Sequence, residues 1–289
     1  MPIIIILGAI ITGGWVGWHL ADRGITAQNA FQAHQKEGYW LGAVILGLGT
    51  LCAIIMTSGR NSPWLPKFLP LYLGAYFWYV ILFVCAFCCG LLVCLEKSSW
   101  RDWQRLDWKR LGQVILFTIV SGLSIWFLLY QNAPITELLG APRLVQGVVM
   151  QTTPFSCSAA TIATLSRRLQ PERQITEADI VKLAQTSRQG TSTLAEIHAL
   201  RDLGLVPQYE TNLTINDLVS RQQLAVLHVM EPFNGVKIQH AIGLLAINPQ
   251  QRTLTVANPL YGLQVKSYDQ MPGYWLGEAV FVTREPNGR

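Results

Sequence analysis

Four long apolar segments fill the first half of the chain. They cover residues 2–20, 40–58, 69–95 and 112–130. Three have 19 residues and one has 27, and none contains Asp, Glu, Lys or Arg. Each is therefore long enough to cross the ~30 Å hydrocarbon core of a bilayer as a helix. Aromatic side chains near their ends, such as Trp15 and Trp126, match interfacial belts. We expect a four-helix transmembrane domain over residues 1–131.

The second half carries helical periodicity first and strand periodicity afterwards. The expected helices lie within residues 157–169, 176–184, 190–204 and 214–220. The expected strands lie at residues 224–230, 241–247, 253–257, 263–267 and 279–283. Helices followed by a sheet indicate an α+β domain, here over residues 145–289. Residues 132–144 contain two Pro and one Gly, which indicates a linker.

The distribution of charge supports this division. The whole chain is 51% hydrophobic and 13% charged, against about 25% charged residues in ordinary soluble domains. Residues 1–132 hold 9 Lys or Arg and 5 Asp or Glu, whereas residues 133–289 hold 13 and 12. The composition excludes a disordered chain. The net charge of +5 is dispersed and indicates no nucleic-acid partner.

Basic residues between the apolar segments predict the orientation in the membrane. Residues 96–111 carry five Lys or Arg, whereas the connections at 21–39 and 59–68 carry two each. The positive-inside rule places the 96–111 connection in the cytoplasm. Four spans then place the second domain outside the cytoplasm. An odd number of spans would place it on the cytoplasmic face, which remains the alternative.

Six cysteines are present, and five of them lie within the apolar segments. These five are Cys52, Cys85, Cys88, Cys89 and Cys94. No His or carboxylate accompanies them, so we interpret them as small apolar side chains and expect no metal site. Cys157 is the only cysteine of the second half, where it is either a buried filler or a nucleophile.

Four polar residues of the second half form a candidate catalytic set. Cys157 starts a predicted helix, capped by Ser156, where free N–H groups and the helix dipole favour a thiolate with a lowered pKa. His240 begins a predicted strand and can act as the base. Asn258 ends the next strand and can hold the imidazole. Gln151 precedes Cys157 by six residues, and its amide could join an oxyanion hole.

His228 is a rival for the role of base. It lies inside the apolar strand predicted at 224–230, and no Asn or Asp on the next strand accompanies it. The occurrence of Gln, Cys, His and Asn in this order, in a domain whose helices precede its strands, indicates a catalytic site much more specifically than any one of these residues. We therefore favour His240.

Residues 146–267 resemble the bacteriocin-processing, double-glycine leader cysteine peptidases, a papain-like family. The matching stretches are residues 151–160, 190–204, 240–245 and 256–262. The resemblance implies that Cys157, His240 and Asn258 form the triad and that Gln151 lines the oxyanion hole. It also implies cleavage of a peptide or leader sequence after small residues.

The chain departs from the family pattern in three ways. Ser158 replaces the usual Gly after the nucleophile, and Asn258 replaces the usual Asp, so less negative charge faces the imidazolium. The peptidase-like domain follows the apolar segments instead of preceding a transporter. No phosphate-binding G-x-x-x-x-G-K-[ST] loop is present, so we expect no ATP bound by this chain, although a separate transporter is a possible partner.

The sequence thus predicts a membrane-anchored cysteine peptidase that needs no cofactor. The alternative is a non-catalytic peptide-recognition module of a membrane export or assembly complex. Other acyl-transfer reactions, such as amidase or transpeptidase chemistry, would use the same nucleophile. Transport by the apolar segments themselves is disfavoured because they contain no charged residues.

Overall fold

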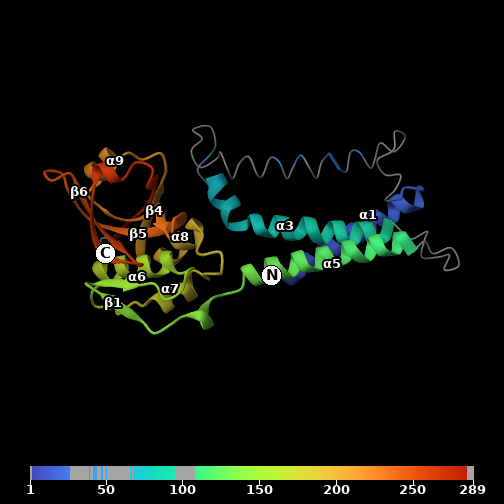
Figure 1. Ribbon diagram of the computed structural model, residues 1–289, viewed down its shortest axis with the longest axis horizontal. Helices are drawn as coiled ribbons and strands as arrows, with labels where there is room; N and C mark the ends of the chain where they lie inside the picture. The colour runs from blue at the N-terminus through green and yellow to red at the C-terminus, as the bar shows by residue number, and fades with distance from the viewer. Residues whose placement is uncertain are drawn as a thin grey trace, which may run out of the picture. The chain divides into compact units, whose positions relative to one another are not determined.

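The computed structural model describes residues 2–26, 66, 68–95 and 108–284, together with positions 39, 42, 43, 47 and 50. The chain divides into two compact units (Figure 1). The N-terminal unit comprises residues 1–59 and 76–131, and the C-terminal unit comprises residues 60–75 and 132–289.

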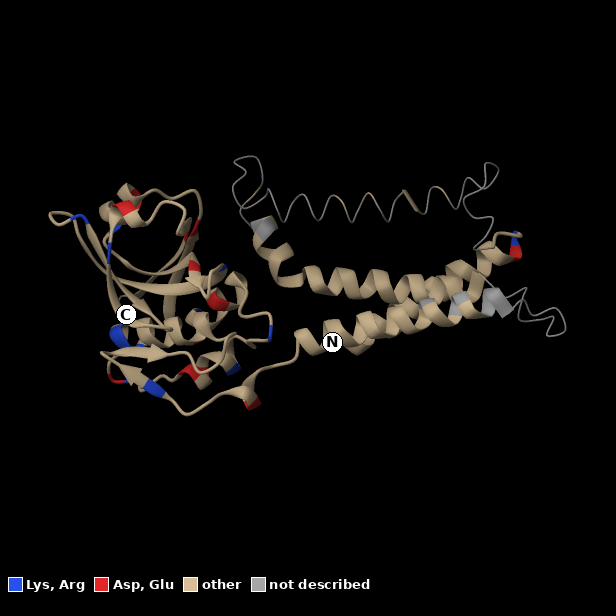
Figure 2. Ribbon diagram, in the orientation of Figure 1, with Lys and Arg blue, Asp and Glu red and all other residues tan. Residues whose placement is uncertain are grey.

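Three helices account for most of the described part of the apolar half. They are α1 (Pro2–Asp22), α3 (Phe68–Leu95) and α5 (Trp108–Gln131). In the described residues, two stretches are long and apolar enough to cross a bilayer, Pro2–Asp22 and Leu71–Leu95, and the apolar stretch Thr118–Gln131 is shorter. Charged positions are almost absent from these helices (Figure 2). The predicted span at 40–58 lies largely outside the described residues, so the four-helix prediction is supported only in part.

Helices α1 and α3 approach each other through glycine. A Cβ atom added to Gly13 would collide with the backbone carbonyl of Phe87, and one added to Gly17 would collide with that of Leu91. In the opposite direction, a Cβ atom on Gly90 would collide with the carbonyl of Ile10. Small residues allow helix backbones to pack closely in this way, as the spacing of Gly13 and Gly17 predicts.

The C-terminal unit is built on a six-stranded antiparallel sheet with strand order β3-β8-β4-β5-β6-β7. Its strands are β3 (Leu205–Glu210), β4 (Leu224–Phe233), β5 (Val236–Asn248), β6 (Thr253–Asn258), β7 (Gly262–Ser267) and β8 (Trp275–Arg284). Its helices are α6 (Cys157–Leu169), α7 (Glu177–Leu183), α8 (Thr193–Asp202) and α9 (Ile215–Arg221). A short hairpin of β1 (Arg143–Val145) and β2 (Val148–Met150) precedes α6. The predicted α+β class is confirmed.

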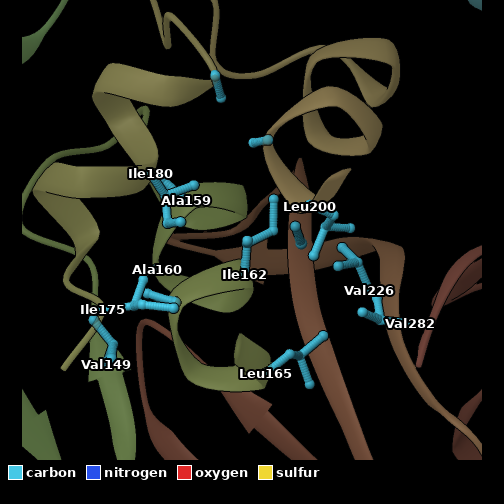
Figure 3. Close-up of a cluster of buried hydrophobic side chains, with 14 of the residues drawn as sticks. Val149, Ala159, Ala160, Ile162, Leu165, Ile175, Ile180, Leu200, Val226 and Val282 are labelled. Atoms are coloured by element: carbon cyan, nitrogen blue, oxygen red, sulfur yellow. The ribbon is translucent and has the colours of Figure 1, made fainter. Parts of the chain in front are cut away.

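Helix α6 lies at the centre of one hydrophobic core, which joins it to the sheet (Figure 3). Ile162 and Leu165 of α6 are fully buried in this cluster, as are Val226 of β4 and Val282 of β8. The absence of a side chain at Gly243 lets α6 approach β5, because a Cβ atom there would meet Leu165 Cδ2 at 3.2 Å. A second core, which includes Leu227, Ile242 and Phe281, uses other residues of the same strands.

Local sequence signals place most of these elements correctly. Thr176 caps α7 through a capping box, and Gly204 follows α8 with a positive φ of 76°. Strand β3 and the β1–β2 hairpin were not predicted. Strand β5 begins at Val236, so His240 lies inside this strand instead of at its start. Within the expected linker, Ile135 is fully buried and its N–H donates to the Thr186 carbonyl at 3.2 Å.

Replacement of Gly13 by Val is expected to destabilise the N-terminal unit by about 2 kcal/mol, because the added methyl groups meet the Phe87 backbone and force α1 away from α3. Gly8→Val is the matched control, since nothing lies within 4 Å of a Cβ atom at this position of the same helix. The stability of both variants is measured in detergent, as the loss of the helical circular dichroism signal with increasing sodium dodecyl sulfate. Equal loss in the two variants would contradict the proposed close packing.

Candidate active site

Cys157 is the first residue of α6 and follows a tight turn. The Ser156 hydroxyl does not cap the helix as predicted. Instead it donates to the Thr153 carbonyl at 3.1 Å and accepts from the Thr153 hydroxyl at 2.8 Å. The hydroxyl therefore closes the turn before the helix. The N-terminus of α6 therefore has no side-chain cap, and no capping side chain occupies the Cys157 N–H.

Burial raises the pKa of the Cys157 thiol, and the negative charge of Glu196 raises it further. The backbone N–H groups of Ala241 and Ser158 act in the opposite direction, but they do not outweigh burial. This result differs from the lowered pKa predicted from the position at the helix start. The free-energy cost of removing a thiolate from water is larger here than the stabilisation that the helix N-terminus provides.

His240 and Asn258 are brought together by the pairing of β5 with β6. The His240 Nε2 atom lies 3.0 Å from Asn258 Oδ1, and both side chains are buried. The thiol of Cys157 is close enough to accept a hydrogen bond from the N–H of Ala241, which directly follows His240. The structure therefore brings Asn258 next to His240, and it places the Cys157 thiol of α6 at the residue that follows His240 in β5.

Burial lowers the pKa of His240, although the hydrogen bond to Asn258 and the charge of Glu231 partly oppose this effect. The imidazole is therefore neutral near pH 7, as a general base must be before it accepts a proton. Cys157 is also protonated under these conditions. The resting site thus contains a thiol and a neutral imidazole.

The amide of Asn258 is held by a buried carboxylate that sequence reasoning missed. Asn258 Nδ2 donates to Glu231 Oε2 at 3.0 Å, and the Tyr274 hydroxyl donates to the same oxygen at 2.6 Å. The Leu260 N–H donates to Asn258 Oδ1 at 3.0 Å. The only sequence signal was a lone Glu directly after the apolar run 224–230.

Gln151 links the loop before α6 to the turn after Asn258. Its backbone N–H donates to the Pro259 carbonyl at 3.0 Å, and its Nε2 donates to the Thr153 carbonyl at 2.8 Å. One amide hydrogen of Gln151 thus holds the turn before Cys157, while the second is left to another acceptor. Its Oε1 is buried without a partner among the described residues.

His228 has partners that the sequence did not reveal. Its Nε2 lies 3.0 Å from a carboxylate oxygen of Glu196 on α8, and its Nδ1 lies 3.2 Å from Glu278 Oε1 on β8. The Tyr209 hydroxyl donates to Glu278 at 2.7 Å. Burial lowers the pKa of His228, but the two carboxylates outweigh it and raise the pKa to about 10. A histidine that is protonated at neutral pH cannot accept a proton, so this pKa disfavours His228 as a base.

The described residues contain no group of three or more His, Cys, Asp or Glu side chains arranged to hold a metal ion. The groups that the site offers for chemistry include the Cys157 thiol, the His240 imidazole and the amides of Asn258 and Gln151. This set matches nucleophilic acyl transfer, in which a base activates the nucleophile and a third group orients the base.

Comparison with known proteins finds matches among solved structures only. No family model matches the chain, and no curated protein matches it. The peptidase domain of Streptococcus ComA, a bi-functional ABC transporter involved in a quorum sensing pathway, is 19% identical, with a TM-score of 0.42. That match covers 48% of this chain and 98% of the ComA domain.

Two further structures are similar at a comparable level. A double glycine motif protease from an AMS/PCAT transporter, in complex with the leader peptide, is 16% identical and covers 50% of this chain and all of its own, with a TM-score of 0.40. The N-terminal peptidase C39 like domain of the toxin secretion ATP-binding protein from Vibrio parahaemolyticus is 14% identical. It covers 45% of this chain and 98% of its own, with a TM-score of 0.37.

Replacement of His228 by Gln is expected to destabilise the C-terminal unit by about 3 kcal/mol at pH 7, because it leaves a buried carboxylate unpaired. The raised pKa also sets a pH dependence. The stabilisation from His228 is complete below its ordinary pKa of about 6.5 and is lost as the pH rises through about 10.

Thermal unfolding of the full chain, followed by near-ultraviolet circular dichroism, measures both effects. His198→Gln is the matched control, because His198 is exposed on the helix that carries Glu196. We expect the unfolding temperature of the wild type to decrease as the pH is raised from 7 to about 10. The part of this decrease that His228 causes should be absent in His228→Gln. An unchanged pH dependence in that variant would disprove the assignment.

Proposed function

We propose that the chain is a membrane-attached cysteine peptidase in which Cys157 is the nucleophile, His240 the general base and Asn258 the orienting amide. One observation carries the proposal: the His240 ring is hydrogen-bonded to Asn258, and the thiol lies against the N–H of the very next residue, Ala241. This relation supports a triad, in which a third group orients the base beside the nucleophile.

The reaction follows from the protonation states of the resting site. His240 Nδ1 accepts the thiol proton as Sγ attacks the substrate carbonyl carbon, and the carbonyl oxygen becomes an oxyanion. The imidazolium then donates this proton to the leaving amine, and the C–N bond breaks to leave a thioester. His240 next takes a proton from water, the hydroxide attacks the thioester, and the acid product leaves as Cys157 recovers its proton.

Gln151 and the N-terminus of α6 can stabilise the oxyanion. The uncapped Cys157 N–H and the second Nε2 hydrogen of Gln151 are the two donors that we assign to it. Such donors act mainly on the transition state, because only there does the oxygen carry a full negative charge.

The proposed substrate is a peptide or leader sequence that is cut after small residues, as the resemblance of the motifs around Cys157 and His240 implies. Helix α1 and the stretch Leu71–Leu95 have the length and composition to anchor the chain in a bilayer. Such an anchor would present the peptidase to substrates at the membrane or to a separate transporter.

One observation favours a second candidate function, a peptide-recognition module without catalysis. The raised pKa of Cys157 leaves the thiol protonated, and a protonated thiol is a poor nucleophile unless a base takes its proton. The two candidates differ in whether His240 controls the reactivity of Cys157.

Replacement of Cys157 by Ala is expected to abolish peptide hydrolysis, and Gln151→Ala is expected to lower kcat by roughly 10² with little change in KM. Gln189→Ala, an exposed glutamine on the same domain, is the matched control and is expected to retain activity. Steady-state hydrolysis of a peptide with a Gly-Gly pair measures all three variants. An effect of Gln151→Ala on KM alone would reassign this residue to substrate binding.

The orientation predicted from the 96–111 connection gives a further test, although most of that connection lies outside the described residues. We expect an alkaline phosphatase fused to the C-terminus, which is active only outside the cytoplasm, to show activity, because five basic residues hold that connection inside. A fluorescent reporter that folds only in the cytoplasm is the paired measurement. Fluorescence from this fusion would instead place the peptidase on the cytoplasmic face.

A further inference from the structure

A continuous line of buried hydrogen bonds extends from the base of the proposed triad to Glu231. His240 bonds to Asn258 Oδ1, Asn258 Nδ2 donates to Glu231 at 3.0 Å, and the Tyr274 hydroxyl donates to the same carboxylate oxygen at 2.6 Å. Asn258 is fully buried, and Glu231 is 5% exposed. Buried carboxylates are uncommon and costly unless they are paired or hydrogen-bonded, so this one requires a reason.

The first consequence of this arrangement is the orientation of the Asn258 amide. A carboxylate only accepts hydrogen bonds, so the NH₂ group of Asn258 must face Glu231. The Leu260 N–H independently requires an acceptor on the other side of the amide, which is Oδ1. The oxygen of Asn258 therefore faces His240, and the His240 Nε2 atom must carry the proton. The lone pair of the neutral ring then lies on Nδ1, the atom assigned to the thiol.

The second consequence is electrostatic. An asparagine offers only a dipole to the imidazolium that forms when His240 takes the thiol proton, whereas an aspartate would offer a charge. The carboxylate of Glu231 is close enough to act on His240 through space. Because little water separates these buried groups, its charge is only weakly screened.

Two further titratable groups lie beside this line. Tyr274, from the segment before β8, donates to Glu231, and Cys157 of α6 lies at the N–H of Ala241, which follows His240. The ammonium group of Lys266 on β7 lies 4.3 Å from the centre of the Tyr274 ring, and Tyr261 also acts on Tyr274. The charge of Glu196 acts instead on Cys157. Among the groups that act on His240 itself, Glu231 is the carboxylate.

We propose that Glu231 is a positioning residue of the proposed peptidase: acting through Asn258, it selects the His240 tautomer and supplies the negative charge that an aspartate would otherwise provide. The inference rests on the proposed function. A single acidic side chain would both orient the imidazole and supply negative charge. Here the neutral Asn258 and the charged Glu231 share these two functions.

The test is the rate at which iodoacetamide alkylates Cys157 in the full chain in detergent, read by mass spectrometry on the peptide that contains Cys157. The range from about pH 4 to about pH 10 brackets the ordinary pKa values of histidine and cysteine. Glu231→Gln keeps an oxygen that accepts from Asn258 and Tyr274 but removes the charge. We expect alkylation to become roughly tenfold slower near pH 7. We also expect the acid limb, which is set by His240, to move to lower pH, because the imidazolium loses its carboxylate.

A reciprocal exchange separates charge from packing. In the double variant Glu231→Gln, Asn258→Asp, the amide and the carboxylate change places, and every hydrogen bond of the line can form again. We expect this variant to recover most of the wild-type rate and to move the acid limb back to higher pH. Glu278→Gln is the matched control, since Glu278 is also a buried carboxylate that accepts from a tyrosine hydroxyl, and it should leave the acid limb in place.

The possible outcomes are distinct. If wild-type alkylation does not change in His240→Ala, the proposed function itself fails. If it does change but Glu231→Gln keeps the wild-type profile, the function stands and the role of Glu231 is wrong. A slower rate with an unmoved acid limb, or no recovery in the exchanged variant, also overturns the role of Glu231. If neither variant folds, as judged by circular dichroism, Glu231 is structural and the inference fails.

Discussion

The contact between α6 and β5 is the constraint on which the candidate site depends. The Thr161 hydroxyl donates to the Ala241 carbonyl at 3.0 Å, and Gly243 leaves room for the side chains of Leu165 and Thr161. These contacts fix the position of α6 along its own axis relative to β5. A displacement by one helical turn would move the Cys157 thiol about 5.4 Å along the helix axis, out of reach of the Ala241 N–H. The packing of the core thus decides whether the thiol lies at the strand residue that follows His240.

Two buried networks on this sheet combine the same kinds of side chain and produce opposite protonation states. His228 contacts the carboxylates of Glu196 and Glu278 directly, and this contact keeps its ring protonated. His240 is separated from Glu231 by the neutral amide of Asn258, and burial keeps its ring neutral. The distance from a histidine to the nearest carboxylate therefore separates a structural cation from a candidate base.

The resting state of the site follows from this balance. Burial disfavours both the thiolate and the imidazolium. In the proposed peptidase, proton transfer from Cys157 to His240 would therefore be coupled to attack on the substrate. Any group that stabilises the imidazolium lowers the cost of this step. The hydrogen-bonded line behind His240 is placed to do so, whereas the charge of Glu196 opposes formation of the thiolate.

Elements with strong local signals could be predicted from the sequence. The capping box at Thr176 and the glycine after α8 act within a few residues, and so does the apolar stripe of α6. Strand β3 was missed because Pro207 interrupts its pattern and its partner in the described sheet, β8, is distant in the chain. An edge strand tolerates such a proline, because one side of its backbone needs no partner in the sheet.

The sequence by itself determined the residue types and the chain order of the candidate site: Gln151, Cys157, His240 and Asn258. Only the tertiary structure decided how these residues are charged and held. Glu231 reaches Asn258 from β4, and Tyr274 reaches Glu231 from the segment before β8. Glu196 and Glu278 reach His228 from α8 and β8. Such partners are separated by tens of residues in the chain, so no local pattern reveals them. The protonation state of a buried group depends on these long-range contacts and on its burial.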